Sequence, residues 1–193
     1  MKLTSITIIL SLGVTLVLLP SGCSTTTAAL EDLAPENTAH LKADATNALE
    51  RLYAMNPTAR TLGGKAQAIL IFPDVLKGGL MIGAETGNGV LRQKGHTTGY
   101  YNITAASYGY QVGVQTFGYA IFFMNKPALK YLSASGGWQI GTGPSVVVVD
   151  EGKAKTLTTT TLTQDAYAFV FGQSGLMAGM GLEGSKISRI NPP

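Results

Sequence analysis

Two histidines and eleven carboxylates are the residues of this 193-residue chain from which an active site could be built. Gly172-Gln-Ser174-Gly175 is one residue short of the turn that presents a nucleophilic serine. Such a serine also needs a histidine base, but we expect His40 on the surface of a helix and His96 in a loop. The carboxylates are scattered, with no pair placed for acid–base chemistry. The sequence therefore predicts no catalytic residue and a protein that is not an enzyme.

Cofactor sites find no better support. Gly179-x-Gly181-x-x-Gly184 matches the letters of the dinucleotide-binding fingerprint. That fingerprint requires a helix after the glycines and an acidic residue about 20 positions later, whereas residues 185–190 alternate like a strand. No group of His, Cys, Asp and Glu has the spacing of metal ligands. We therefore expect neither a cofactor nor a metal.

The composition indicates a surface with few charges. A net charge of +3 is too small to indicate nucleic-acid binding. Charged residues make up 13% of the chain and hydrophobic residues 45%. So few charges predict an extensive apolar or neutral surface, part of which would face lipid or a partner.

The first residues of the chain are typical of an exported lipoprotein. Lys2 precedes the apolar run from Ile6 to Leu19, which has the length of a signal peptide and is too short to span a bilayer. The run leads into Pro20-Ser21-Gly22-Cys23, which resembles a lipobox with Pro20 in the place of the usual leucine. The alternative is an ordinary secretory peptide with an incidental cysteine.

We therefore divide the chain into three parts. Residues 1–22 are predicted to be a cleaved signal peptide, and residues 23–36 a lipidated N-terminus and flexible tether. Residues 37–193 are predicted to form a single domain. Ser24, in place of aspartate after the cysteine, favours the outer membrane. The predicted location is its periplasmic face, anchored through Cys23.

Helices are expected in three places. Apolar residues at spacings of 3 and 4 predict a helix from Asn37 to Met55. Asn56-Pro57 ends it and starts a short second helix, which Gly63-Gly64 ends. Asn125 with Pro127 predicts a third helix that runs to Leu132. The face expected to be buried on the first helix consists of Leu41, Ala45, Ala48, Leu52 and Met55.

Short strands fill the rest of the chain. Residues 68–72 form an apolar strand closed by Pro73, and Gly87-Asn88-Gly89 predicts a hairpin turn. A second hairpin is expected across Gln173-Ser174-Gly175. Further strands are expected at 98–104, 108–115, 117–124, 146–149, 166–171 and 176–183. The predicted fold class is α+β, with a curved, mostly antiparallel β-sheet or barrel-like core of Gly-rich strands covered by two or three helices.

Four segments repeat a glycine at both ends, at 79–83, 109–113, 137–141 and 175–179. Each contains G-x-x-x-G, but none lies in the apolar helix of about 20 residues that a membrane helix pair needs. As strands, they would present a nearly bare glycine face and an apolar face that we expect to pack in the core. The bare face would serve either sheet curvature or a flat groove for an acyl chain or peptide.

Four strings, Lys77–Glu85, Gly89–Leu91, Ala105–Gly113 and Leu176–Gly184, together resemble the SYLF family, also called the Ysc84 domain. Eukaryotic members bind phosphoinositides and other acidic phospholipids, and some bind actin filaments; bacterial members are commonly exported lipoproteins. The resemblance implies a non-enzymatic phospholipid-binding lipoprotein of the bacterial envelope that recognises anionic phospholipid or a membrane surface. The alternative is a protein-interaction or envelope-structural module whose glycine face receives a segment of an envelope protein.

Three pairs of basic residues are candidates for lipid binding. Lys126 and Lys130 are four apart on a predicted helix and share a face. Arg92 and Lys94 share a face of a strand. Basic residues contribute about 1 kcal/mol each near an anionic membrane. The full predicted set is Lys65, Lys77, Arg92, Lys94, Lys126 and Lys130.

Overall fold

The computed structural model describes residues 26–134, 136–149 and 163–193. The predicted signal peptide, 1–22, and the predicted lipidation site, Cys23, lie outside these residues. The elements are α1 (Thr26–Met55), α2 (Pro57–Lys65), β1 (Ala68–Gln93), β2 (His96–Phe123), α3 (Lys126–Lys130), the 3₁₀ turn η1 (Tyr131–Ser133), β3 (Trp138–Gln139), β4 (Val146–Val149) and β5 (Ala166–Ile190).

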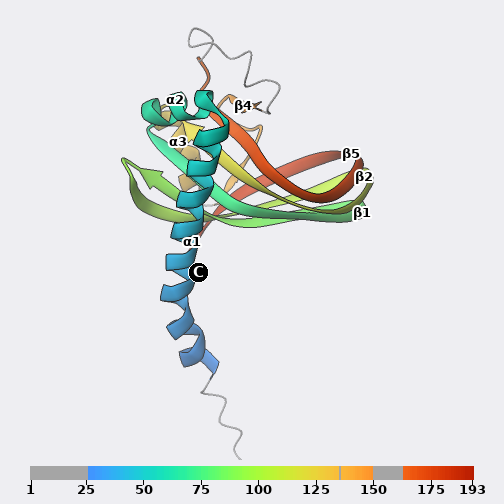
Figure 1. Ribbon diagram of the computed structural model, residues 1–193, viewed down its shortest axis with the longest axis horizontal. Helices are drawn as coiled ribbons and strands as arrows, with labels where there is room; N and C mark the ends of the chain where they lie inside the picture. The colour runs from blue at the N-terminus through green and yellow to red at the C-terminus, as the bar shows by residue number, and fades with distance from the viewer. Residues whose placement is uncertain (1–25, 135, 150–162) are drawn as a thin grey trace, which may run out of the picture.

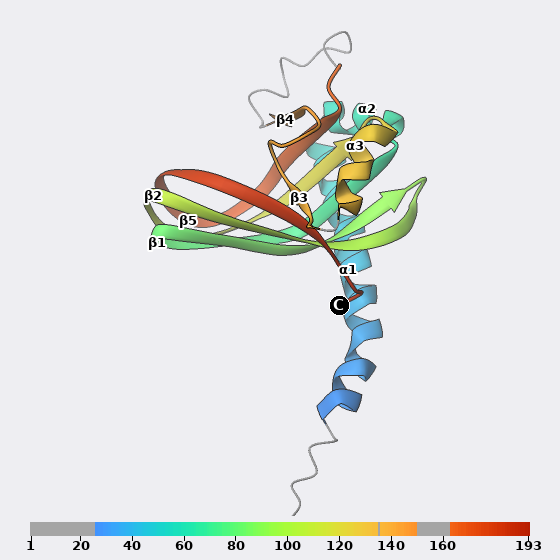
Figure 2. The ribbon, with the colours of Figure 1, turned by 180° about the vertical axis from the view of Figure 1, so that it is seen from behind.

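Three long strands form most of one curled sheet. β1, β2 and β5 pair antiparallel in the order β1-β2-β5, with β3 antiparallel to β5 and β4 parallel to it. Figures 1 and 2 show these strands running away from α2 and α3, bending at the far side and returning. The α+β fold class with a curved, mostly antiparallel sheet and three helices is therefore confirmed.

Close approach between the two halves of β1 shows how tightly the sheet curls. A Cβ at Gly89 would lie 2.5 Å from Cδ1 of Phe72. One at Gly87 would lie 2.8 Å from the carbonyl oxygen of Asp74. The strand therefore crosses its own earlier part where a side chain would not fit.

These glycines correct one predicted turn. The β1–β2 hairpin turns at Lys94-Gly95, where φ is +49° and +82°, and not at residues 87–89. Asn88 instead pairs with Asn102 inside the ladder, and Asn102 Nδ2 donates a hydrogen bond to Asn88 Oδ1 at 2.9 Å. Gly87-Asn88-Gly89 therefore marks the place where the later part of β1 crosses its earlier part, and the chain does not reverse there.

Other predicted strand ends are wrong for a similar reason. β1 continues past Pro73 with a bulge between Phe72 and Val75, which an edge strand tolerates. β2 and β5 are each continuous where we expected separate strands. Gly175, predicted in a turn, pairs with Gln115. The segment at 137–143 forms only the two residues of β3.

Two apolar cores lie on either side of the sheet's first half. One lies inside the fold of the sheet and contains Trp138, Phe72 and Ile187. The other lies between the sheet and the helices, where Leu52 and Leu62 belong to the same cluster as Phe122. The predicted α1 face is confirmed for Ala45, Ala48 and Leu52, which are buried, but Met55 is exposed.

Helix α1 is longer than the sequence indicated. It begins at Thr26, so residues 26–36, expected in a flexible tether, are helical. Strong helix formers such as Ala28 and Leu30 favour the helical conformation, although Pro35 was expected to interrupt a helix here. Within α1, Thr38 Oγ1 donates a hydrogen bond to the carbonyl oxygen of Pro193 at 2.8 Å, which ties the helix to the segment after β5. Within the described residues, no helix is both long and apolar enough to cross a bilayer.

Candidate anion-binding cleft

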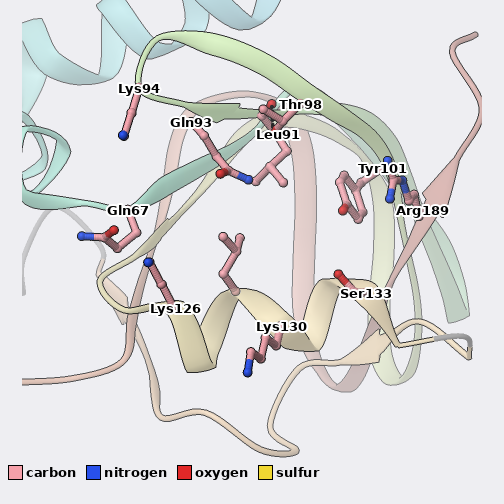
Figure 3. A pocket seen from close by; sticks show the side chains of 11 residues that line it. Gln67, Leu91, Gln93, Lys94, Thr98, Tyr101, Lys126, Lys130, Ser133 and Arg189 are labelled. Atoms are coloured by element: carbon pink, nitrogen blue, oxygen red, sulfur yellow. Dashed lines mark hydrogen bonds between the residues drawn. The ribbon is translucent and has the colours of Figure 1, made fainter.

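A cleft of about 490 Å³ opens between the β1–β2 turn, α3 with η1, and the end of β5 (Figure 3). Its side chains come from segments far apart in the sequence. The residues that line it are Gln67, Leu91, Gln93, Lys94, Thr98, Tyr101, Lys126, Leu129, Lys130, Ser133 and Arg189.

A capped turn of helix places the lysines of α3 at the cleft. Asn125 Oδ1 accepts a hydrogen bond from Ala128 N at 2.9 Å, and Pro127 occupies the first turn. Ala128 and Leu132 are buried, which fixes the inner side of the segment. The predicted helix is thus present, although its last residues are the 3₁₀ turn η1.

A hydrogen-bonded carboxylate ties this cap to the start of β5. Asp165 accepts hydrogen bonds from Ser145 N at 3.0 Å, from Asn125 Nδ2 at 2.7 Å and from Ser145 Oγ at 3.0 Å. These bonds favour the charged form and hold the pKa of Asp165 below its ordinary value, with the backbone bond from Ser145 the largest cause. The loop that enters α3 is therefore anchored by a carboxylate that stays charged at neutral pH.

Four cations line the cleft, and none of its lining side chains is acidic. Figure 3 shows Lys94 and Lys126 at one end beside Gln67, and Arg189 at the other end beside Tyr101. The amine of Lys130 lies on the outer side of α3. The cleft therefore presents positive charge at both ends.

The middle of the cleft is apolar. Leu91 lies between Lys94 and Arg189 in Figure 3, and Leu129 and the ring of the buried Tyr101 also line the cleft. Burial raises the pKa of Tyr101, and the nearby Arg189 opposes this in part. Its hydroxyl is therefore protonated at neutral pH. Cations around an apolar floor suit an amphiphile whose anionic part meets the charges and whose carbon skeleton covers the leucines.

Half of the six basic residues predicted for lipid binding line this cleft, namely Lys94, Lys126 and Lys130. Arg92 faces a neighbouring cavity of about 450 Å³, which shares Lys94 and Gln67 with the first. There its Nη1 donates to Thr46 Oγ1 at 3.4 Å and its Nη2 to the carbonyl oxygen of Gly95 at 3.3 Å.

Two predicted residues lie elsewhere. Lys65 is the exposed last residue of α2 and lines neither cavity. The side chain of Lys77 forms an ion pair with the buried Glu85, with Nζ 3.5 Å from Oε2. These two residues line a separate cavity of about 310 Å³. The predicted set therefore does not form one patch.

Arg189 is a site residue that the sequence analysis missed. It pairs with Tyr101 across β2 and β5, two positions after the buried Ile187. Because side chains alternate along a strand, Arg189 shares the inward face with Ile187. A basic residue on the inner face at the end of a strand is the signal that could have identified it.

Comparison with protein families gives one match. Residues 104–191 match the Ysc84 family model, described as Las17-binding protein actin regulator. The matched span includes most of β2, all of α3 and β5, and therefore Lys126, Lys130 and Arg189. Comparison with curated proteins finds no match. The match supports the resemblance to the Ysc84 (SYLF) family over residues 104–191 of this chain.

Proposed function

We propose that this chain binds the anionic head groups of phospholipids in the cleft formed by the β1–β2 turn, α3 and the end of β5. One observation carries the proposal, which is the gathering of Lys94, Lys126 and Arg189 around an apolar floor, with no carboxylate among the described residues that line the cleft. The Ysc84 family is a family of binding domains, so a binding role without catalysis agrees with the match.

The chemistry of the cleft fits a phosphate-bearing amphiphile. Arg189 can hold two phosphate oxygens at once, while Lys94 and Lys126 act as point charges at the other end. The volume of about 490 Å³ lies in the range of small-molecule sites and exceeds the space a bare phosphate needs. Leu91 and Leu129 give the glycerol and first acyl carbons an apolar surface.

The proposal extends to the location of the protein. Anchoring through Cys23 at the periplasmic face of the outer membrane would hold the cleft near lipid at high local concentration. Phosphatidylglycerol, cardiolipin and phosphatidic acid are the anionic lipids that such an envelope offers. This part of the proposal rests on the lipobox-like sequence alone.

Charge-neutralising variants test the cleft directly. Lys94→Gln with Lys126→Gln removes two of its charges, and Arg51→Gln with Lys65→Gln removes two exposed charges from α1 and α2. All chains carry Cys23→Ser so that no acyl anchor contributes. Binding is measured by co-sedimentation with phosphatidylglycerol–phosphatidylcholine vesicles and with phosphatidylcholine vesicles, both at low salt.

We expect the cleft variant to lose roughly 30-fold in affinity for the anionic vesicles, from about 1 kcal/mol for each charge. The control pair should lose much less, because its charges are outside the cleft. Equal losses in both pairs would show that only net charge matters and would overturn the proposal. Absence of any preference for anionic over neutral vesicles in the parent chain would do the same.

A further inference from the structure

The outside of the sheet's bend carries an apolar surface that no helix covers. We call this surface the bend tip and define it as residues 78–84 of β1, 107–115 of β2 and 174–182 of β5, which pair with one another. Figures 1 and 2 place it at the side of the molecule away from α2 and α3. It is thus separate from the cleft.

Large apolar side chains are concentrated at the bend tip. Leu80 is 74% exposed, Ile82 68% and Leu176 88%. Leu80, Ile82 and Leu176 thus correct the prediction that the apolar face of the glycine segments packs in the core, whereas Trp138 of the segment at 137–141 is buried as predicted. The described residues include eleven exposed large apolar side chains, and seven of them belong to the bend tip. Those seven are Leu80, Met81, Ile82, Tyr108, Val112, Val114 and Leu176.

The bend tip also lacks charge. None of its three segments contains Asp, Glu, Lys, Arg or His, although the described surface elsewhere carries many of them. An exposed apolar surface of this kind, with no charged residue for a water-facing role, marks an interaction site. Its neutral polar groups, such as the hydroxyl of Tyr108, suit the boundary between water and lipid.

Shape and charge favour a bilayer over a second copy as the occupant. The bend tip is convex, so a protein partner would need an apolar hollow to receive it. Four cavities lined by described residues each carry at least one ionisable side chain, such as Lys94, Arg92, Asp44 or Glu85. A fluid lipid interface needs no preformed hollow.

The open edges of the sheet limit how far the tip can enter. At the bend, β1 is the outer strand, and β3 and β4 pair with β5 only at residues 186–187 and 166–169. Unpaired backbone groups along both edges require water or head groups as partners. We propose that the bend tip inserts shallowly into the head-group region and upper acyl chains of a lipid bilayer, whatever the charge of its lipids.

This inference uses a surface separate from the proposed cleft, and the two can fail independently. A fluorophore sensitive to polarity reports insertion when it is attached at Val112→Cys of the bend tip, in a chain that also carries Cys23→Ser. The control label is attached at Thr61→Cys, which is exposed on α2 and lines neither the cleft nor the neighbouring cavity. Both chains are mixed with phosphatidylcholine vesicles in high salt, where the cations of the cleft are screened.

We expect a blue shift and gain of fluorescence at Val112→Cys and none at Thr61→Cys. A second comparison uses Leu80→Gln, Ile82→Gln and Leu176→Gln together, against Met55→Gln and Val148→Gln on other exposed surfaces. The tip variant should bind phosphatidylcholine vesicles at least about tenfold more weakly, since burial of apolar groups drives insertion.

Two results would overturn the inference. One is an unchanged signal at Val112→Cys when vesicles are added. The other is a signal that rises with protein concentration in the absence of lipid, which would assign the bend tip to a second copy of the chain. The cleft variant should lose its preference for anionic vesicles at low salt. Its Val112→Cys signal on phosphatidylcholine vesicles in high salt should be unchanged, which would separate the two surfaces.

Discussion

Gly113→Ala tests whether glycine is required where the sheet bends. Gly113 lies in β2 with φ of +137°, a conformation that residues with a side chain rarely adopt. A Cβ there would overlap the carbonyl oxygen of Leu176 in the neighbouring β5 and lie 2.9 Å from the Cα of Met177. Neither obstacle is the movable end of a side chain, so the backbone of one strand must shift.

The cost of this change follows from two terms. The unfavourable φ costs an alanine about 1–2 kcal/mol, and displacement of packed backbone adds about 1–3 kcal/mol. We expect a loss of about 2–5 kcal/mol, which is a large part of the 5–15 kcal/mol typical of a domain. Gly184→Ala is the matched control in β5, because a Cβ there meets nothing within 4 Å.

Urea unfolding followed by tryptophan fluorescence measures the difference. The chain has one tryptophan, Trp138, which is 2% exposed and packs against Phe123 with ring centroids 5.8 Å apart. We expect the urea midpoint to fall in Gly113→Ala. In Gly184→Ala, the free energy of unfolding should remain within about 0.5 kcal/mol of the parent. Equal stability of the two variants would refute the steric reasoning.

Three further predictions concern single interactions. The pKa of Asp165 is lowered in the folded chain. Its hydrogen bonds therefore stabilise the fold fully above the unfolded pKa of about 3.9, and this contribution is lost as pH falls through the lower folded pKa. Urea midpoints measured between pH 5 and pH 2.5 should fall less steeply in Asp165→Asn than in the parent. Lys77→Met removes an ion-pair partner of Glu85, whose side chain is 6% exposed, and should destabilise the fold by about 3 kcal/mol in thermal unfolding; a smaller loss in Lys77→Met with Glu85→Gln would show that the buried charge of Glu85 is the cause. Asn56→Ala removes the cap of α2, in which Asn56 Oδ1 accepts from Ala59 N at 3.0 Å, and should cost about 1 kcal/mol, whereas Asn56→Asp should retain most of it.

Local signals predicted the helices well, because their ends depend on neighbouring residues. Asn56 and Asn125 cap α2 and α3 as their sequence positions indicated. The start of α1 was missed, because residues 26–36 lack the apolar spacing on which the prediction relied, while their helix propensity alone supports a helix.

Strand boundaries could not be predicted in the same way. A glycine or proline that ends a strand and one that bends it look alike in the sequence. At Gly89 the deciding contact is with Phe72, and at Gly113 it is with Leu176 in another strand. Such contacts depend on the register of pairing, which no short window of sequence contains.

The cleft was only partly predictable for a related reason. Lys126 and Lys130 share a helical turn, and Lys94 is in the hairpin turn, but nothing in their spacing shows that these two regions meet. Arg189 completes the cation cluster from the last strand of the sheet. Lys77, one of the predicted lipid-binding residues, is instead paired with Glu85.

The bend of the sheet explains its glycines but leaves the apolar residues beside them unexplained. Gly113 and Gly175, both with positive φ, lie where a Cβ would meet the backbone of the adjacent strand. Leu80 and Leu176 point outward into open space, so the bend imposes no such limit on them. Polar residues would satisfy the same geometry with less risk of aggregation. An uncharged apolar rim on the exposed side of a glycine bend therefore indicates a role in binding, and the shallow insertion proposed above supplies one.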